Sequence, residues 1–333
     1  MATVDVIVPC YNYGRYLREC VESVLSQEGV SVRVLIIDDC SSDESTEVGR
    51  ELAAEDARVE FRRHEVNRGH IATYNEGIAW LTADYCLLLS ADDVLIPGAL
   101  ARAAGVFIAH PDVVLTHGKV IRTAKPNLQS DRHAITNSVT IRSGTEFVRV
   151  QCVSGMNGVE TPTAVGRTVI QKRLQGYRRE LPHSADMEMW LRYAAHGSIA
   201  CLHSHQAYYR QHGNNMSVGY AGVKDLRHLW LAFDSFFEHH QQLFACREWR
   251  RLAANGIAWQ AFGEAYHAFL AGDQQLCRAY VKFAREISPT TLLHPQWFLL
   301  WCKRQLGPRL WKHLMRRGPR AEAVGGGTPP SRF

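Results

Sequence analysis

Short apolar segments rich in β-branched residues alternate with helical segments through the first 120 residues of the chain. The predicted strands span residues 4–8, 32–37, 58–63, 85–89 and 113–116. Helical spacing of apolar residues predicts helices between them, over residues 15–27, 44–54, 71–81 and 97–109. Strands that alternate with helices in this way favour one mostly parallel sheet with helices on both faces.

The alternation stops near residue 120. The polar residues 122–142 are predicted to form a loop, and the elements expected after them are helices near 145–151, 163–174 and 186–195 and a short strand at 207–210. Beyond residue 220 only helical spacing remains, at 226–237, 257–270 and 276–287. We therefore expect an α/β domain over residues 1–220, a helical extension over 221–320, and a disordered tail over 321–333 that is rich in Gly and Pro.

Charge and cysteine content argue against several classes of protein. The net charge of +5 over 333 residues does not favour nucleic-acid binding. Nine cysteines without CxxC or CxxH spacing, and a beginning without a signal-peptide pattern, predict a cytoplasmic protein whose cysteines are mostly small buried hydrophobes. No GxGxxG motif follows the first strand, which argues against a dinucleotide-dependent oxidoreductase. The turn after that strand also lacks the Gly-rich basic loop of a nucleotidyltransferase.

Polar side chains follow three of the predicted strands at the point where each strand ends. Tyr11 and Asn12 follow the first strand, Asp38–Asp39 the second and Asp92–Asp93 the fourth. Open α/β sheets bind ligands outside the carboxyl ends of their strands. We therefore expect these three clusters to converge on one site.

The acidic pair Asp92–Asp93 has two interpretations. Adjacent carboxylates repel, so such a pair usually has a cation or a basic partner, and their hard oxygens suit Mg²⁺ or Mn²⁺ bridging to phosphate. A solvated turn that caps the next helix explains the pair equally well. For Asp38–Asp39 alone, the helix-capping loop is the better explanation, and hydrogen bonding to a ribose or a base is the functional alternative.

Five further residues suit a site but are each explained by an ordinary structural role. Tyr11 could stack on a planar base, and Arg68 could meet negative charge before a helix. Asp186 could act as a general base, although an acid in the first turn of a helix commonly only complements the helix dipole. Arg210 and His212 suit a diphosphate or a metal, whereas a surface position is the usual one for such residues.

In combination, six segments resemble, in their order along the chain, the motifs of family 2 inverting glycosyltransferases, which have the GT-A fold. They are Ile7–Asn12, Ile36–Asp43, Asn67–Gly69 with Asn75, Leu87–Asp93, the segment around Asp186, and Tyr209–His212. The resemblance covers residues 3–220. It implies a Rossmann-like, mostly parallel sheet with helices on both faces, and the helical extension follows it.

The resemblance also implies roles for individual residues. The donor would be a nucleotide diphosphate sugar, typically a UDP-sugar, and the residues implied to bind it are Pro9, Tyr11, Asn12, Asp39, Arg68, Asn75, Asp92 and Arg210. The implied ligands of Mn²⁺ or Mg²⁺ are Asp92, Asp93 and His212. Asp186 would deprotonate the acceptor hydroxyl. Many members of the family have Asp where this chain has Ser90, so one carboxylate of the usual acidic motif is missing here.

The expected acceptor is a glycan or a lipid-linked glycan, in polysaccharide, cell-envelope or other glycan biosynthesis. Residues 303–320 contain seven Lys or Arg and no acid, and aromatic and leucine residues precede and interleave with them. This composition predicts either peripheral contact of residues 297–320 with the inner face of a membrane or a packed terminal helix with a solvated basic face. The apolar helices beyond 220 are also compatible with a homo-oligomer. The alternative function is an inactive nucleotide-sugar-binding or scaffold subunit of a glycan-assembly complex.

Overall fold

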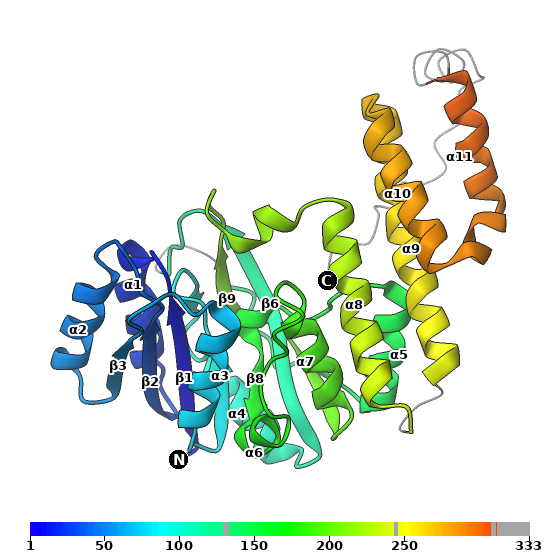
Figure 1. Cartoon of the computed structure of the whole chain (residues 1–333). Coiled ribbons are helices and arrows are strands. Elements are labelled where there is room, and N and C mark those ends of the chain that lie inside the picture. The colour runs from blue at the N-terminus through cyan, green and yellow to red at the C-terminus, as the bar shows by residue number, and fades with distance from the viewer. Residues whose placement is uncertain (129–132, 243–245, 308–310, 312–333) are drawn as a thin grey trace. The chain divides into compact units, whose positions relative to one another are not determined.

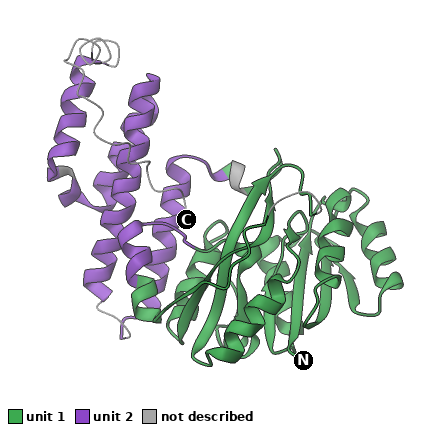
Figure 2. Ribbon diagram, turned by 180° about the vertical axis from the view of Figure 1, so that it is seen from behind, with its two compact units in different colours: residues 1–148, 159–219 green, residues 149–158, 220–333 purple. Residues whose placement is uncertain are grey.

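The computed structural model describes residues 1–128, 133–242, 246–307 and 311. It divides into two compact units, which Figure 2 distinguishes by colour. The first unit contains residues 1–148 and 159–219, and the second contains residues 149–158 and those from 220 onward. The segment 149–158, which we assigned to the α/β domain, thus belongs to the second unit. The tail predicted at 321–333 lies outside the described residues.

Within the described residues, nine strands of the first unit form one sheet (Figure 1). In sheet order the strands are β3 (Val59–Arg63), β2 (Ser31–Asp38), β1 (Thr3–Cys10), β4 (Tyr85–Leu88), β8 (Val165–Arg167), β6 (Val113–Thr123), β9 (Ser198–Arg210) and β5 (Val94–Leu95), and β7 (Val139–Arg142) also pairs with β9. We call β3, β2, β1 and β4 the parallel half, because each of them is parallel to its neighbours in this group. We call the remaining strands the mixed half.

The mixed half differs from the sequence prediction. Strand β8 is antiparallel to both β4 and β6, whereas β6 and β9 are parallel to each other. Strand β8 lies where one helix was expected over 163–174, and only residues 168–173 of that range form an α-helix. The expected loop 122–142 ends in β7, and β9 begins nine residues before the predicted strand 207–210. Strands of two or three residues such as β5 and β8 carry no periodicity that sequence reading can detect.

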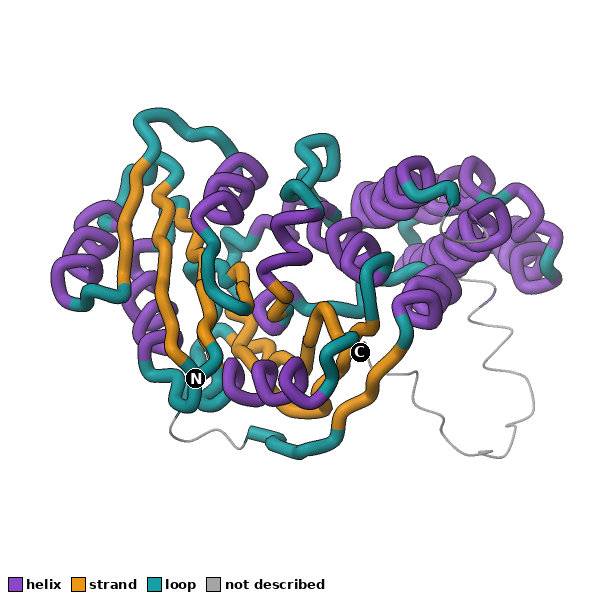
Figure 3. Tube along the Cα trace, turned by 90° about the horizontal axis from the view of Figure 1, so that it is seen from below, coloured by secondary structure: helices purple, strands orange, loops and turns teal. Residues whose placement is uncertain are grey.

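Helices lie on both faces of the sheet, as predicted, and Figure 3 shows helices and strands in different colours. The helices that begin in this unit are α1 (Gly14–Leu25), α2 (Ser45–Glu55), α3 (His70–Trp80), α4 (Ala99–Ala109), α5 (Gly144–Ser154), α6 (Thr168–Arg173) and α7 (Ala185–Ala194). Valines of β1 and β2 pack with α1, α2 and α4 in one buried cluster. On the other face, α3, α6 and α7 enclose a small void of about 10 Å³ together with Ile7 and Leu88.

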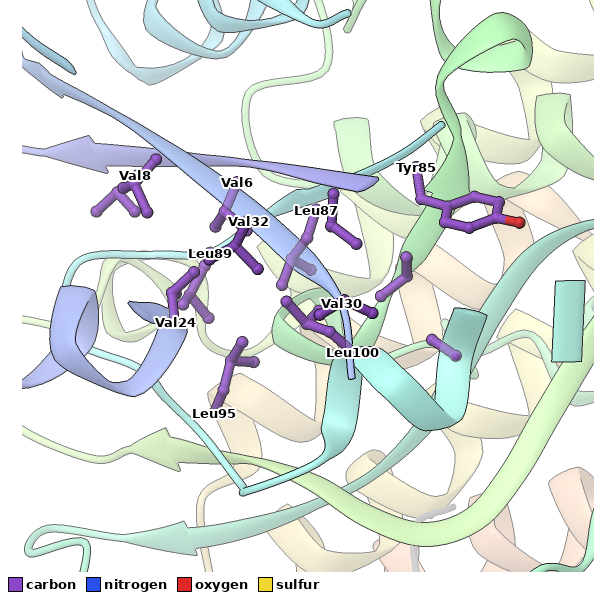
Figure 4. Packing of buried hydrophobic residues seen from close by; sticks show 14 of the residues in the cluster. Val6, Val8, Val24, Val30, Val32, Tyr85, Leu87, Leu89, Leu95 and Leu100 are labelled. Atoms are coloured by element: carbon purple, nitrogen blue, oxygen red, sulfur yellow. The ribbon is translucent and has the colours of Figure 1, made fainter. Parts of the chain in front are cut away.

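The main apolar cluster explains why the strand predictions succeed in the parallel half. Figure 4 shows its centre, where Val6, Val8 and Val32 from the strands lie near Val24 of α1 and Leu100 of α4. These side chains are buried because both faces of a parallel sheet are covered, so its strands are nearly continuous apolar runs. Five of the nine cysteines are also buried, and all nine are free thiols.

The second unit is helical. Its helices are α8 (Val223–His239), α9 (Cys246–Ala271), α10 (Gln274–Ile287) and α11 (Pro295–Leu306), with the 3₁₀ turn η3 (Pro289–Leu293) before α11. Helix α9 packs against α8, α10 and α11. The predicted helices at 226–237, 257–270 and 276–287 are confirmed as α8, α9 and α10. In the part of the chain that the structure describes, no helix is long and apolar enough to cross a membrane.

Candidate active site

A cavity of about 460 Å³ lies at the carboxyl ends of the parallel strands in the first unit. Pro9 lines it from the end of β1, Tyr11 and Asn12 line it after β1, Asp39 after β2, and Ser90 after β4. The structure thus brings the predicted polar clusters to one edge of the sheet. Tyr11 is 49% exposed there, so its ring is available to a ligand.

The Asp39 carboxylate organises the wall of this cavity. Its Oδ1 accepts hydrogen bonds from the backbone N–H of Arg68 (2.8 Å) and lies 2.6 Å from Nδ1 of His64, and its Oδ2 accepts from the N–H of Gly69 (2.8 Å). Gly69 has φ of +81°, a backbone conformation that favours glycine. A carboxylate has about four acceptor positions. Asp39 therefore holds the loop before α3 in place and keeps capacity to accept a further hydrogen bond from a ligand.

Three predicted donor-binding residues make structural contacts. Asn12, with φ of +58°, accepts the backbone N–H of Ser42 at its Oδ1 (2.8 Å), which ties the loops after β1 and β2 together. The Arg68 guanidinium pairs with Glu76 at 2.9 Å, and the residue contributes its backbone N–H to Asp39. Asn75 is bonded through both side-chain atoms to the backbone of Tyr177, at 2.7 and 2.9 Å. Neither Arg68 nor Asn75 is among the residues that line the cavity.

The two carboxylates after β4 have different surroundings. Asp92 and Asp93 are both buried. Oδ2 of Asp92 lies 2.9 Å from Nε2 of His212, whereas Oδ1 of Asp93 accepts the backbone N–H of Arg210 at 3.0 Å. Burial, followed by the charge of Asp92, raises the pKa of Asp93 well above its ordinary value. Asp92 thus contacts His212, the residue predicted to share a metal with it, whereas Asp93 bonds the turn after β4 to β9.

Asp92 and His212 suit neighbouring positions on a divalent cation. Adjacent ligands of an octahedral ion with bonds of about 2.1 Å lie about 3 Å apart, and the oxygen and nitrogen here are 2.9 Å apart. Among the described residues, no group of three His, Cys, Asp or Glu side chains is placed to hold a metal. The predicted set of Asp92, Asp93 and His212 is therefore not assembled as three ligands. A magnesium-type ion usually binds only one or two protein groups, with phosphate and water completing its shell, so the pair still fits.

Arg210 is a buried residue that supports Asp92 and His212. It is 5% exposed, its Nε donates to the backbone oxygen of Asp92 at 2.8 Å, and its guanidinium pairs with Glu19. The same guanidinium lies 4.5 Å from the centre of the Tyr16 ring, which stacks on His212 at 5.2 Å. The structure therefore places Arg210 as a support for Asp92 and His212, although the resemblance implied a donor-binding role.

Sequence reasoning missed the side chains around His212. The Tyr13 ring contacts His212 edge-on at 5.3 Å, and its hydroxyl donates to the backbone oxygen of Asn214. The Oδ1 of Asn215 accepts the N–H of His212 at 2.6 Å. The sequence offered two signals for this cluster. They are the tyrosines at 13 and 16, at the start of a helix, and the two asparagines after His212. Tyr13 and Asn214 line the cavity, so the aromatic cluster connects it to the Asp92–His212 pair.

The predicted base, Asp186, lies in the first turn of α7. Its Oδ1 accepts the backbone N–H of Met187 at 2.7 Å, and its Oδ2 accepts the hydroxyl of Thr161 at 3.0 Å. Burial and then the charge of Asp186 raise the pKa of Tyr74, which itself lines the cavity. Asp186 itself is not among the residues that line the cavity, and its link to the cavity wall is this electrostatic effect on Tyr74.

His70 is a further cavity residue that sequence reasoning passed over. Its Nε2 lies 2.7 Å from the backbone oxygen of Pro182, so this nitrogen carries the proton and donates it. Burial lowers the pKa of His70, which favours the neutral ring. The cavity wall therefore contains an imidazole with one donor nitrogen already used.

Residues 5–170 match the family model described as glycosyl transferase family 2. An uncharacterized glycosyltransferase of Nostoc sp. is 30% identical over 231 residues, which are 66% of this chain and 68% of the relative. The chain belongs to glycosyl transferase family 2. For several other curated relatives of this glycosyltransferase, the match spans less than half of the relative's own length.

Two groups of solved structures resemble this family 2 enzyme. S. aureus TarS 1–349 in complex with UDP-GlcNAc gives a TM-score of 0.63 at 16% identity, over 87% of this chain and 83% of the TarS 1–349 chain. The mannosyltransferase PcManGT of Pyrobaculum calidifontis, in complex with GDP-Man and Mn²⁺, gives 0.51 at 15% identity, over 95% and 88%. At these identities the likeness shows the fold. The predicted GT-A architecture followed by a helical region is confirmed.

Proposed function

We propose that this glycosyltransferase inverts the anomeric carbon as it moves a sugar from a nucleotide diphosphate sugar, with a UDP-sugar expected, to a hydroxyl group of an acceptor glycan. The observation that carries the proposal is the cavity at the strand ends, which has Tyr11 and Asp39 in its wall and continues through Tyr13 and Asn214 to the Asp92–His212 pair. A nucleoside needs an aromatic face and a hydrogen-bond acceptor, and the charged diphosphate attached to it needs a partner for its charge.

The nucleoside would occupy the part of the cavity between Tyr11 and Asp39. An exposed tyrosine ring offers a face for stacking on a base. The remaining acceptor position of Asp39 suits a ring N–H, which uracil and guanine both possess. TarS was solved with UDP-GlcNAc, and PcManGT with GDP-Man. Both bases fit this description, so the donor screen described below decides between a UDP-sugar and a GDP-sugar.

Asp92 and His212 would hold a divalent cation, Mn²⁺ or Mg²⁺, beside the diphosphate. When bound, such a cation neutralises negative charge on the phosphate oxygens. The protein's own contribution is to hold the two ligands in place: Arg210 supports the backbone at Asp92, and Tyr16 stacks on the His212 ring. Side chains held by fixed partners need little rearrangement when charge develops on the leaving group.

Asp186 would take the proton of the acceptor hydroxyl. The acceptor oxygen forms a bond to the anomeric carbon on the face opposite the diphosphate, the bond from that carbon to the phosphate oxygen breaks, and the proton passes to a carboxylate oxygen of Asp186. One displacement of this kind inverts the anomeric centre. The hydroxyl of Thr161 and the N–H of Met187 orient the two oxygens of the base.

The decisive experiment compares donor binding with transfer in the wild type and in Asp186→Asn. A thermal-shift screen of nucleoside diphosphates and their sugars with Mn²⁺ first identifies the donor. Asp186→Asn should bind that donor as the wild type does, and transfer to acceptor should fall at least about 10²-fold, the usual contribution of a positioned base. Transfer by this variant close to the wild-type rate would remove Asp186 from the mechanism.

The alternative is an inactive subunit that binds a nucleotide sugar and assembles with other proteins. Such a protein would show a thermal shift with the donor and no release of nucleoside diphosphate with any acceptor. The Thr161–Asp186 contact favours the enzyme, because a binding subunit needs no carboxylate whose oxygens are oriented by hydrogen bonds. An acceptor series of free sugars, glycans and lipid-linked glycans separates the two cases and identifies the acceptor class.

A further inference from the structure

His70, the first residue of α3, has its two ring nitrogens in different surroundings. Nε2 donates its proton to the backbone oxygen of Pro182 at 2.7 Å. Burial lowers the pKa of His70, so at neutral pH the ring carries a single N–H and Nδ1 is an unprotonated acceptor. Among the described residues, no group donates a hydrogen bond to Nδ1, and this atom is not one of the described polar atoms that are fully buried without a partner. A ligand can therefore reach it.

Contacts on two sides hold the imidazole in this orientation. Its ring meets the Tyr74 ring edge-on at 5.4 Å between ring centres. The chain segment that contains Pro182 is itself fixed to α3, because both side-chain atoms of Asn75 bond to the backbone of Tyr177. Turning the ring over would place the carbon Cε1 where Nε2 donates, and the bond to Pro182 would be lost. Nδ1 is thus oriented before any ligand binds, which lowers the entropic cost of binding.

His70 lies in the part of the cavity proposed to hold the nucleoside. It lines the cavity together with Asp39 and with Gly69, whose N–H bonds to the Asp39 carboxylate. The charge of Asp39 is near enough to raise the pKa of His70, against the larger effect of burial. Asp39 and Nδ1 of His70 are therefore two hydrogen-bond acceptors in one part of the wall. Such a wall suits a ligand with several donor groups, and a nucleoside has them in its ribose hydroxyls and its base.

We propose that Nδ1 of His70 accepts a hydrogen bond from the nucleoside of the sugar donor, given by a ribose hydroxyl or by a base amino group. The inference rests on the proposed function and adds a residue that selects the nucleoside. An unprotonated nitrogen cannot donate to a phosphate oxygen or to a base carbonyl. Uracil has carbonyl groups on both sides of its N–H, so a uridine nucleotide would use its ribose. Guanine has an amino group beside its N–H and could use either group.

A purely structural role for His70 would involve Nε2 alone, as a tie between α3 and Pro182. Two substitutions separate the nitrogens. Glutamine can place its amide nitrogen where Nε2 lies and keep that donor, but it has no acceptor at the position of Nδ1. Asparagine can place its side-chain oxygen near the position of Nδ1, but it loses the bond to Pro182. The proposal predicts that His70→Gln is the more damaging change for nucleotide binding, and a structural role predicts the reverse.

Calorimetric titration of the full-length protein with UDP and with GDP, each in the presence of Mn²⁺, tests the proposal. For the nucleotide that binds wild type more tightly, His70→Gln should raise Kd about three- to tenfold, the usual contribution of one hydrogen bond between uncharged groups. His70→Asn should keep a Kd close to that of wild type. His110→Gln, a control on the exposed surface, should bind as wild type does. In transfer assays with the corresponding sugar nucleotide, the loss in His70→Gln should appear in KM for the donor rather than in kcat.

Nucleotide analogues identify the group that donates to Nδ1. The 2′,3′-dideoxy analogue of UDP or GDP lacks both ribose hydroxyls, and IDP lacks the amino group of GDP. Loss of the bonded group should weaken binding to wild type about three- to tenfold and should have little effect on His70→Gln, which has already lost the acceptor. This comparison needs only His70→Gln, so it stands even where His70→Asn is too unstable to measure.

Equal Kd values for wild type and His70→Gln overturn the inference and leave the proposed transfer reaction in place. Equal losses in His70→Gln and His70→Asn overturn it as well, because the two nitrogens would then have no separate roles. So does a series in which every analogue loses the same factor in wild type and in His70→Gln. Failure of wild type to bind either nucleotide would contradict the proposed function, and this inference with it.

Discussion

The parallel and mixed halves of the sheet contribute to the candidate site in different ways. In the parallel half, a single helix joins each strand to the next one along the chain, and the loops after β1, β2 and β4 line the cavity directly. In the mixed half, β6 pairs with β9 across a large sequence separation. The mixed half contributes the segment from Arg210, the last residue of β9, to Asn215. The Tyr11–Asp39 part of the cavity wall is therefore built by local structure, and the Asp92–His212 pair depends on long-range pairing.

The turn from Ser90 to Asp93 joins the two halves. Asp93 is bonded to the backbone of Arg210, and Asp92 meets His212, a residue 120 positions away in sequence. Both contacts require β9 to lie beside β5, which pairs with it antiparallel. We therefore expect changes in the parallel half and in the mixed half to affect stability, donor affinity and transfer rate separately. Four experiments test this.

The largest expected effect comes from removing the divalent cation, which would couple the halves. Chelation with EDTA should lower transfer about 10³-fold, because the diphosphate loses a charge partner worth several kcal/mol, and Mn²⁺ should restore it. His212→Ala should need at least tenfold more Mn²⁺ for half-maximal rate, while His110→Ala, an exposed control, should behave as wild type. Undiminished transfer after chelation would contradict the metal site.

Asp39→Ala should damage the parallel half alone. The change leaves two backbone N–H groups and His64 without their acceptor in a buried place, so the free energy of unfolding should fall by about 3 to 5 kcal/mol. Donor affinity should fall as well. The matched control is Asp56→Ala, whose carboxylate pairs only with Arg58 on the surface and should change stability by less than about 1 kcal/mol. Urea unfolding and donor titration measure both quantities.

Acid should destabilise the mixed half through His117 of β6. Burial, assisted by the nearby charges of Arg142 and His203, lowers the pKa of His117 from 6.5 to about 4. The unfolded chain therefore binds a proton at a higher pH than the folded protein does. Stability from the neutral ring is complete above pH 6.5 and is lost as the pH falls toward 4, by about 2 kcal/mol between pH 7 and 5.

Replacing His117 with Gln isolates this contribution. The slope of unfolding free energy against pH between 7 and 5 should become flatter in His117→Gln, whereas His110→Gln, on the exposed surface, should keep the wild-type slope. Equal slopes in all three proteins would show that His117 is not the group responsible.

The smallest expected effect concerns the orientation of the base. Thr161→Val removes the hydroxyl that donates to Oδ2 of Asp186, so kcat should fall about three- to tenfold, with KM for the donor unchanged. The acidic limb of the pH–rate profile should move to higher pH, because the carboxylate loses a donor that favours its charged form. Thr161→Ser keeps the hydroxyl and should retain most of the rate. A lower rate without any shift of the limb would indicate a merely structural role.

Much of the parallel half could be predicted from local patterns. Its strands and helices appear where apolar periodicity places them, because each strand is buried on both faces and each helix on one. Tyr11, Asn12 and Asp39 lie together for a general reason, since parallel strands end at one edge. The short strands β5 and β8 escaped prediction because two or three residues have no period.

The roles of individual side chains depend on contacts that no local spacing encodes. Asp92 and Asp93 are adjacent in sequence, yet only Asp92 faces His212, because Asp93 is held by the backbone of β9. Arg210 supports the site from within, since Glu19 and Tyr16 of α1 surround its guanidinium.

The amino-acid sequence was sufficient to indicate the family, the layered fold and the edge where the polar residues gather, because those properties follow from periodicity and motif order. The three-dimensional arrangement was needed to show that Asp92 faces His212 whereas Asp93 and Arg210 bond to backbone groups, and to show which nitrogen of His70 is already bonded. Those properties depend on which distant residues pack together.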